Sequence, residues 1–403
     1  MITRNPMSAR ERRAVGALAL LYSFRMLGLF MVLPLMALYA TEIPGATATL
    51  IGVAIGVYGL SQAILQIPMG WLSDRIGRKP VILAGLIVFA LGSAVAGLAE
   101  SIEGVILGRF LQGAGAIGGS VMALTADLTR DEQRTKAMAI VGATIGVSFA
   151  LALVLGPLVA ASGGLSSVFN LTAGLAVFGI AIVVFVIPTP TAPVVLEDVS
   201  FRLDRLLGVI RDPALLPHYV GVFSLHFILM STFLVVPGVI EGALSVPREQ
   251  HWKVYLPVLG LSVLGMLPLL RLAERNGRAR EVLFGSIVLL LLALVGLTLM
   301  RAPILYYVCL VAYFVAVNFL EATLPSAVSK AADPAFKGTA LGTYSTCQFI
   351  GAFFGGLAGG WALEVGGASW LVLACLVPAA VWLLLSLPGR TAAASPAGSG
   401  SRV

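Results

Sequence analysis

Four ionisable side chains lie inside long apolar runs of this sequence, which makes them candidates for chemistry. They are Arg25, Arg109, His226 and Glu321. Charged groups at bilayer depth are costly, so they face the protein interior and mark substrate, ion or proton paths. Glu321 is our candidate proton carrier, because desolvation favours the protonated form of a carboxyl group. His226 is a second candidate, although a lone histidine is more often a satisfied polar residue.

Uncharged polar residues accompany these groups at helical spacing. Residues three or four apart share a helix face, and the pairs here are Arg109 with Gln112, Asn318 with Glu321, and Tyr344 with Gln348. An arginine does not release its proton near neutral pH, so we expect Arg109 to modulate a carboxylate or to bind an anionic group. Two interpretations stay open at this stage: a static buried network that holds the protein together, or a substrate and proton site.

The composition places these residues in a membrane protein. Hydrophobic residues make up 59% of the 403 residues, charged residues make up 11%, and the mean hydropathy is +0.99. A soluble fold does not cover that much apolar surface. Twelve apolar runs are near the ~20 residues that span a bilayer. They lie near 14–40, 48–72, 80–99, 102–127, 136–161, 165–187, 214–237, 253–273, 281–300, 303–328, 338–361 and 366–387.

The basic residues predict the orientation of these spans. With the N-terminus inside, 21 of the 26 lysines and arginines fall in cytoplasmic segments and three fall outside. The positive-inside rule therefore predicts that both termini are cytoplasmic. Because the net charge of +7 is spread over short loops on one side, we expect no nucleic-acid partner. The three cysteines lie in apolar runs, and no catalytic triad, metal cluster or phosphate loop is recognisable, so we expect no enzyme activity, cofactor or metal.

The sequence divides into two halves of six helices. The first half is 1–187 and the second is 214–387, with a linker at 188–213 and a tail at 388–403 that we expect to be disordered. Within the linker, apolar residues from 199 to 210 recur at helical spacing and predict an amphipathic helix on the inner membrane surface. Residues 268–279 match residues 68–79 at an offset of 200, and Asn318–Glu321 matches Arg109–Gln112. Such a repeat is typical of transporters.

A charged turn follows the second apolar run, and we call residues 70–79 the elbow. A glycine at position 70 allows close helix approach, and Gly77 tolerates the positive φ of a helix reversal. By itself the elbow also fits an ordinary positively charged hairpin. The residues that we expect to act as a conformational latch are Gly70, Asp74, Arg75, Gly77, Arg78 and Lys79, together with Asp127.

The elbow resembles the motif between helices two and three of major facilitator superfamily transporters, Gly-x-x-x-Asp-Arg/Lys-x-Gly-Arg-Arg/Lys. The resemblance implies that Arg78 pairs with Asp127. Residues 109–116 are similar to the fourth-helix motif of the proton-coupled members, whose arginine is implicated in proton transfer. Gly156 and Pro157 match only part of the antiporter motif of helix five, because Ala152, Ala160 and Ala161 replace its other glycines; we expect a helix kink there.

Most of the chain resembles the YajR-like transporters of the drug:H+ antiporter-type branch, for example at residues 24–28 and 318–325. This implies an all-α fold of twelve transmembrane helices in two six-helix pseudo-repeats. It also implies a monomer in the bacterial inner membrane that exports small, drug-like molecules in exchange for protons. The alternatives are a passive facilitator, an uptake symporter, or a non-transporting sensor or scaffold. In the outward-open state we expect the elbow to meet residues 338–342.

Overall fold

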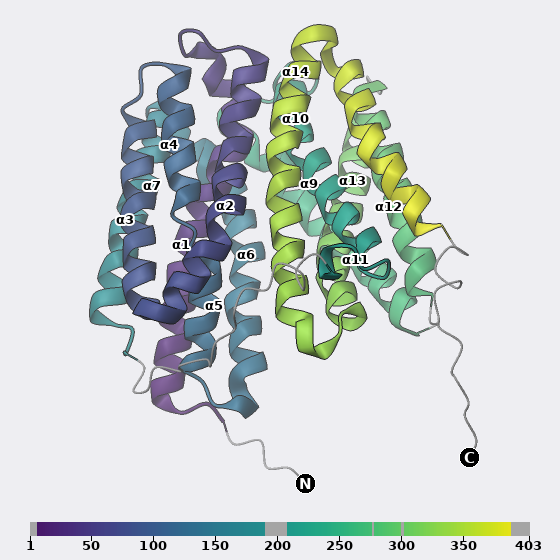
Figure 1. Ribbon diagram of the computed structural model, residues 1–403. Helices are drawn as coiled ribbons and strands as arrows, with labels where there is room; N and C mark the ends of the chain where they lie inside the picture. The colour runs from purple at the N-terminus through teal and green to yellow at the C-terminus, as the bar shows by residue number, and fades with distance from the viewer. Residues whose placement is uncertain (1–5, 190–207, 276–277, 300–301, 388–403) are drawn as a thin grey trace, which may run out of the picture.

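The computed structural model describes residues 6–189, 208–275, 278–299 and 302–387, and this part of the chain is helical without β-strands. Figure 1 shows two side-by-side helical bundles, the first purple to teal and the second green to yellow. The helix that begins at Ala9 and the helix that ends at Ser386 have these described ends directed toward the same end of the molecule, the lower end in Figure 1, which we call the terminal end. The predicted surface helix falls outside the described residues except for helical residues 208–210, and so does the tail at 388–403.

The first bundle contains seven helices. They are α1 (Ala9–Tyr39), α2 (Ala48–Ile76), α3 (Arg78–Gly97), α4 (Ile102–Ala114), α5 (Gly118–Asp127), α6 (Asp131–Ala160) and α7 (Gly164–Phe185), with the 3₁₀ turn η1 (Ala40–Glu42). Polar caps start several of them. The Ser8 hydroxyl accepts from the Glu11 amide at 3.2 Å, and the Glu11 carboxylate accepts from the Ser8 amide at 2.7 Å. This capping box satisfies two amide groups that a helix start leaves unpaired.

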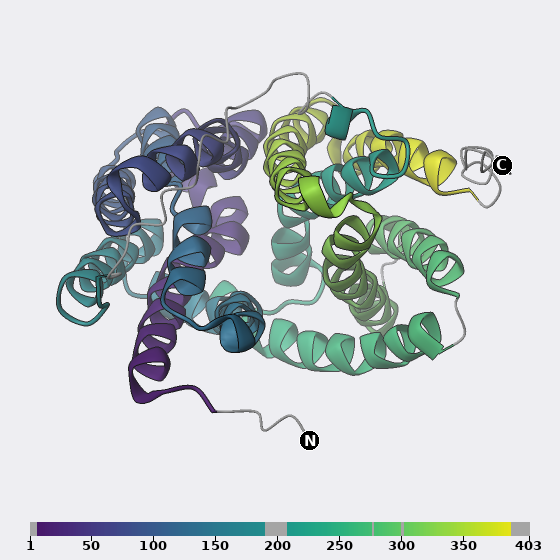
Figure 2. The same cartoon turned by 60° about the horizontal axis from the view of Figure 1, so that its bottom comes forward.

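The second bundle repeats this arrangement. It contains α9 (Leu216–Phe233), α10 (Val236–Gly242), α11 (Trp252–Arg275), α12 (Ala279–Leu299), α13 (Pro303–Ala331) and α14 (Lys337–Ser386), with the 3₁₀ turns η2 (Arg248–Gln250) and η3 (Pro334–Phe336). Viewed toward the terminal end, the two bundles stand beside each other with α14 and α2 at their boundary (Figure 2).

The described helices account for all twelve predicted spans. Eleven segments are long and apolar enough to cross a membrane, and the 50-residue α14 supplies two spans. It turns at Gly366 and Gly367, where Gly367 has a φ of 68° and a ψ of −162°. A side chain is strained in such a conformation, so glycine permits the reversal.

The predicted spans 102–127 and 214–237 are confirmed as membrane-spanning segments, but each consists of two helices. The fourth span divides into α4 and α5 around Gly115, whose φ and ψ are −71° and 48°. The seventh divides into α9 and α10 just before Pro237. A proline has no amide hydrogen for the preceding turn, which explains the second interruption.

Glycines set the packing of α14, as expected for a contact face. A Cβ on Gly351 or Gly355 would lie 2.3 Å from the carbonyl oxygen of Phe223 or Phe227 on α9 of the same bundle. A Cβ on Gly356 would lie 2.3 Å from the Gly52 oxygen of α2, in the other bundle. Adjacent glycine stripes thus join α14 to its own half and to the opposite half.

Contacts between the bundles extend to the end opposite the termini. There the Thr49 amide donates to Glu364 Oε2 at 3.0 Å, and Arg248 Nη1 lies 2.7 Å from Glu42 Oε1. At the terminal end, a Cβ added to Gly70, Gly338 or Gly342 would meet no atom of the described residues within 4 Å. The bundles are therefore in contact at the opposite end, while these three positions of α2 and α14 stand free.

Candidate functional site

A histidine, a carboxylate and an amide meet in the second bundle. His226 of α9 is buried, and its Nε2 lies 3.0 Å from Glu321 Oε1 of α13 and 2.7 Å from Gln348 Nε2 of α14. Its Nδ1 lies 3.1 Å from the Val222 carbonyl oxygen, one turn back on α9. The Glu321 side chain is 34% exposed and Gln348 is partly buried, so both are more accessible than His226. We call His226, Glu321 and Gln348 the histidine cluster.

The geometry of the histidine cluster indicates where protons lie. A carbonyl oxygen only accepts, so Nδ1 carries a hydrogen that it donates to Val222. An amide nitrogen only donates, so Nε2 accepts from Gln348 Nε2, and Glu321 Oε1 lies against the same ring nitrogen. Two groups that are each able to carry a proton, an imidazole and a carboxyl group, are thus in contact across α9 and α13.

Two more predicted residues lie on the same helices. The Asn318 amide donates to the Ser262 hydroxyl of α11 at 2.9 Å and therefore joins α13 to α11 rather than joining the histidine cluster. Tyr344 is one turn from Gln348, is buried, and has no hydrogen-bond partner for its hydroxyl among the described residues.

The predicted arginines form a separate group in the first bundle. Arg109 Nη1 donates to Gln112 Oε1 at 2.7 Å, and Gln112 Nε2 donates to the Ser93 hydroxyl at 2.8 Å. Arg25 Nη2 donates to Gln62 Oε1 at 2.9 Å. The structure therefore brings Arg109 and Gln112 together as the spacing predicted, but it pairs Glu321 with His226 rather than with either arginine.

The elbow turns at Gly77, where φ is 98°, as the sequence predicted for the helix reversal. Arg78 contacts three partners: it pairs with Asp74, donates to the Ser73 hydroxyl at 2.7 Å, and lies 3.3 Å from Asp127 Oδ2. The expected contact between Arg78 and Asp127 is therefore present. A contact of the elbow with residues 338–342 belongs to the outward-open state and stays a prediction.

The other elbow residues hold the turn in place. The Arg75 guanidinium stacks on the Trp71 ring, with its carbon 4.1 Å from the ring centroid. Lys79 Nζ donates to the Ile187 carbonyl oxygen at 2.7 Å and so ties the start of α3 to the segment after α7. A Cβ on Gly70 would meet nothing within 4 Å in the part of the chain that the structure describes, so the close helix approach expected there is not seen in this conformation.

Helix α6 continues without a break through Gly156 and Pro157 and ends three residues later, at Ala160. A Cβ on Gly156 would lie 3.3 Å from the Met31 carbonyl oxygen of α1. The glycine therefore permits close packing of α6 on α1, and the expected kink is not accompanied by a helix break.

Sequence reasoning missed several polar partners. Tyr58, Gln62 and Gln66 recur at four-residue spacing on α2 and so form a polar stripe on one helix face. The spacing could have predicted this stripe, but the segment was interpreted only as an apolar span. The contact of Arg248 with Glu42 was missed because the residues are 206 positions apart and belong to different halves. No local pattern predicts such a pair.

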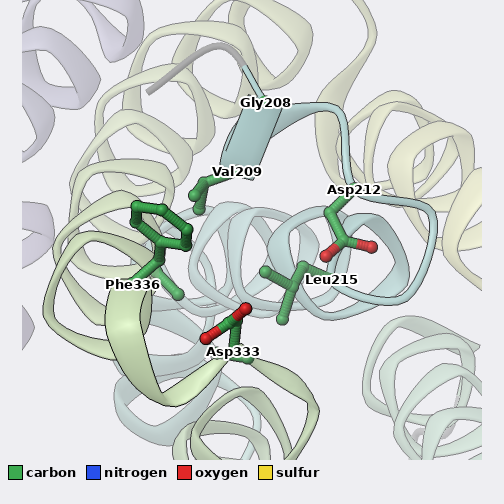
Figure 3. Close-up of a pocket in the computed structure, with 8 residues that line it drawn as sticks. Gly208, Val209, Asp212, Leu215, Asp333 and Phe336 are labelled. Carbon is green, nitrogen blue, oxygen red and sulfur yellow. The ribbon is translucent and has the colours of Figure 1, made fainter. Parts of the chain in front are cut away.

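Two surface pockets lie at the terminal end, away from both buried groups. The first, of about 320 Å³, is drawn in Figure 3; Val209, Leu215 and Phe336 form its apolar lining, and Asp212 and Asp333 supply carboxylates. The second, of about 500 Å³, lies between the start of α1 and the end of α7. Neither pocket contains a predicted site residue.

Comparisons with known proteins agree on one family. A family model described as Major Facilitator Superfamily matches residues 18–256 and 219–402. The inner membrane transport protein YajR of Escherichia coli (strain K12) is 43% identical over 383 residues, covering 94% of this chain and 84% of that protein. Multidrug resistance protein MdtH of Yersinia enterocolitica is 26% identical over 380 residues, covering 90% of this chain and 88% of that protein.

Solved structures share the fold. A bacterial homologue of the human lysosomal transporter Spinster, described as inward-facing and occupied, superposes with a TM-score of 0.78 at 15% identity. The match covers 94% of this chain and 97% of that one. Nucleoside transporter NupG gives a TM-score of 0.75 at 15% identity, covering 93% and 98%.

Proposed function

Since this chain belongs to the Major Facilitator Superfamily and is a multi-pass membrane transporter, not an enzyme, we propose that it exports small amphipathic molecules in exchange for protons. The observation that carries the proposal is the histidine cluster. It places an acid and an imidazole 3.0 Å apart on two different helices, with the acid partly exposed. An exporter driven by protons needs a group that binds a proton from one side and releases it to the other.

The proposed cycle follows from the contacts between the two bundles. The excess of basic residues in the loops of the terminal end supports a cytoplasmic location for that end. With the bundles in contact at the opposite end and the terminal ends of α2 and α14 free, we assign the conformation as inward-facing. We further propose that the protein acts as a monomer in a bacterial inner membrane, the location stated in the name of its relative YajR.

Protonation would change the histidine cluster at a defined place. In the imidazolium–carboxylate form, His226 and Glu321 attract each other and hold α9 against α13. Protonating Glu321 as well leaves His226 charged beside a neutral acid, and this weakens the attraction. Removing the shared proton leaves a carboxylate and an imidazole lone pair in contact. Either change favours separation, so proton binding and helix position are coupled through this pair.

The test is Glu321→Gln in proteoliposomes loaded with a pH-sensitive dye. Substrates are first identified with the wild type, as amphipathic compounds whose addition moves protons. We expect the Gln variant to bind these compounds, because the amide retains a hydrogen bond to His226, but to lose proton movement and uphill transport. Asn318→Ala is the matched control, since Asn318 lies one turn away on α13 and contacts Ser262 instead.

Each of the other outcomes indicates a different function for this protein. Uphill transport by Glu321→Gln would place coupling elsewhere and make the histidine cluster structural. Substrate flux without proton movement in the wild type identifies a passive facilitator. Proton movement in the same direction as the substrate identifies an uptake symporter. Absence of any flux while compounds still bind indicates a sensor on the same fold.

A further inference from the structure

Two buried arginines of the first bundle face the same aromatic ring. Arg25 of α1 is 3% exposed and Arg109 of α4 is fully buried. Their guanidinium carbons lie 6.0 Å and 5.0 Å from the centroid of Tyr58 on α2. Arg25 also lies 5.8 Å from the centroid of Phe89 on α3. Four helices thus meet around two positive charges, and both guanidinium carbons lie within 6.0 Å of the centroid of one tyrosine ring.

Only neutral groups compensate these charges. Arg25 donates to Gln62 and to the Gly115 carbonyl oxygen, and Arg109 donates to Gln112 and to the Ala54 carbonyl oxygen. Among the described residues, no carboxylate forms an ion pair with either arginine. A guanidinium keeps its charge even when buried, so the site carries two positive charges without a counter-charge. Buried charges are costly unless they are paired.

Several donors in this region are still free. Arg25 Nε, Arg109 Nη2 and the Tyr58 hydroxyl are buried and have no hydrogen-bond partner among the described residues. Because buried polar atoms are normally paired, unpaired donors gathered around two cations indicate a missing acceptor.

The break between α4 and α5 brings helix ends close to Arg25. The Gly115 carbonyl oxygen that accepts from Arg25 Nη2 closes the C-terminal end of α4, and α5 begins three residues later at Gly118. The carbonyl end of one helix carries partial negative charge and the amide start of the next carries partial positive charge, so the break does not neutralise the two arginines.

We propose that Arg25, Arg109 and Tyr58 enclose a binding site for one compact anionic group, either a small inorganic anion or the carboxylate of a bound molecule. Gln62 and Gln66 supply a polar route to it: Gln62 accepts from Arg25 and donates to Gln66 Oε1 at 3.5 Å, and Gln66 is only partly buried. The site lies in the first bundle and involves no residue of the histidine cluster. It therefore stands or fails independently of proton-coupled export.

The experiment measures anion binding directly on the purified full-length protein in detergent. The ³⁵Cl linewidth of chloride and the ¹⁹F linewidth of trifluoroacetate report binding of the two anion classes, with empty micelles as the blank. We expect protein-dependent broadening that saturates with anion concentration. If only the chloride signal broadens, the site binds a small inorganic anion. If the trifluoroacetate signal broadens and trifluoroacetate displaces chloride, the site binds a carboxylate.

Variants locate the binding. Arg25→Gln and Arg109→Gln should weaken it by about tenfold or more, as expected when a charge-assisted hydrogen bond is lost. Arg75→Gln is the matched control, because Arg75 is exposed and stacks on Trp71. This variant should bind the anion as tightly as the wild type does. If the buried arginine variants do not fold, Tyr58→Phe decides: it keeps the ring and removes only the free hydroxyl, and it should weaken binding several-fold.

Two results would overturn the proposal. One is that neither anion is broadened by the wild-type protein beyond the micelle blank. The other is that broadening persists unchanged in the folded variants, including Tyr58→Phe, which would place the bound anion elsewhere on the protein.

Discussion

Replacing Gly356 with alanine tests whether the contact between α14 and α2 holds the present conformation. A Cβ at this position would lie 2.3 Å from the Gly52 oxygen and 3.0 Å from the Gly56 nitrogen. Both atoms belong to the backbone of α2, so neither can move aside as a side chain would. We therefore expect Gly356→Ala to push the two bundles apart at this contact.

The size of the effect follows from the clash. Inserting a methyl group into a tightly packed contact costs about 1–3 kcal/mol. Alanine also favours a helix over glycine by about 1 kcal/mol, but this gain is the same in every conformation in which α14 is helical. The clash is relieved only where α2 and α14 separate. The population should thus move toward the outward-facing state by about 5- to 150-fold.

The assay is an inter-spin distance measurement at the terminal end. Labels at Asp131→Cys and Glu281→Cys suit it, because these exposed residues lie in the first turns of α6 in the first bundle and α12 in the second, outside the elbow and residues 338–342. The three native cysteines are replaced by alanine. We expect Gly356→Ala to shorten the distance between the labels as the terminal ends of α2 and α14 approach each other.

Gly355→Ala is the matched control. It produces an equally close contact, 2.3 Å from the Phe227 oxygen, but against α9 of the same bundle. It should lower the melting temperature without changing the distance distribution. An unchanged distribution in a folded Gly356→Ala protein, or the same shift in both variants, would refute the reasoning.

Three further predictions concern the ends of the molecule. Arg248→Gln removes the contact with Glu42 between the bundles. Because the pair is exposed, we expect it to shift the equilibrium toward the outward-facing state by at most about 1 kcal/mol, and by less in high salt. The same spin labels measure this shift. Asp74→Asn should favour the inward-facing state and slow turnover with little change in binding affinity, and an unchanged label distance would rule out the latch. An alkaline phosphatase fused after Arg390 should be inactive and one fused near Pro247 active, whereas the reverse pattern would contradict the orientation.

The sequence by itself determined the architecture. Bilayer thickness sets the length of an apolar run, so the twelve spans could be read before any tertiary contact was known. Local geometry was equally predictable, because glycine at position 77 permits the positive φ that the helix reversal needs, and Arg109 and Gln112 share a face of any α-helix.

Tertiary structure decided which polar groups meet. Glu321 contacts His226, 95 positions away, and Arg248 contacts Glu42, although neither pair has a local signal. The break between α4 and α5 also escaped the pattern, because apolar spacing does not record that the Gly115 carbonyl oxygen accepts from Arg25. The spacing of hydrophobic residues indicates only which faces of a helix contact lipid and which contact the protein core. The pairing of buried charges depends on how separate helices face one another, and that is fixed only when the bundles pack.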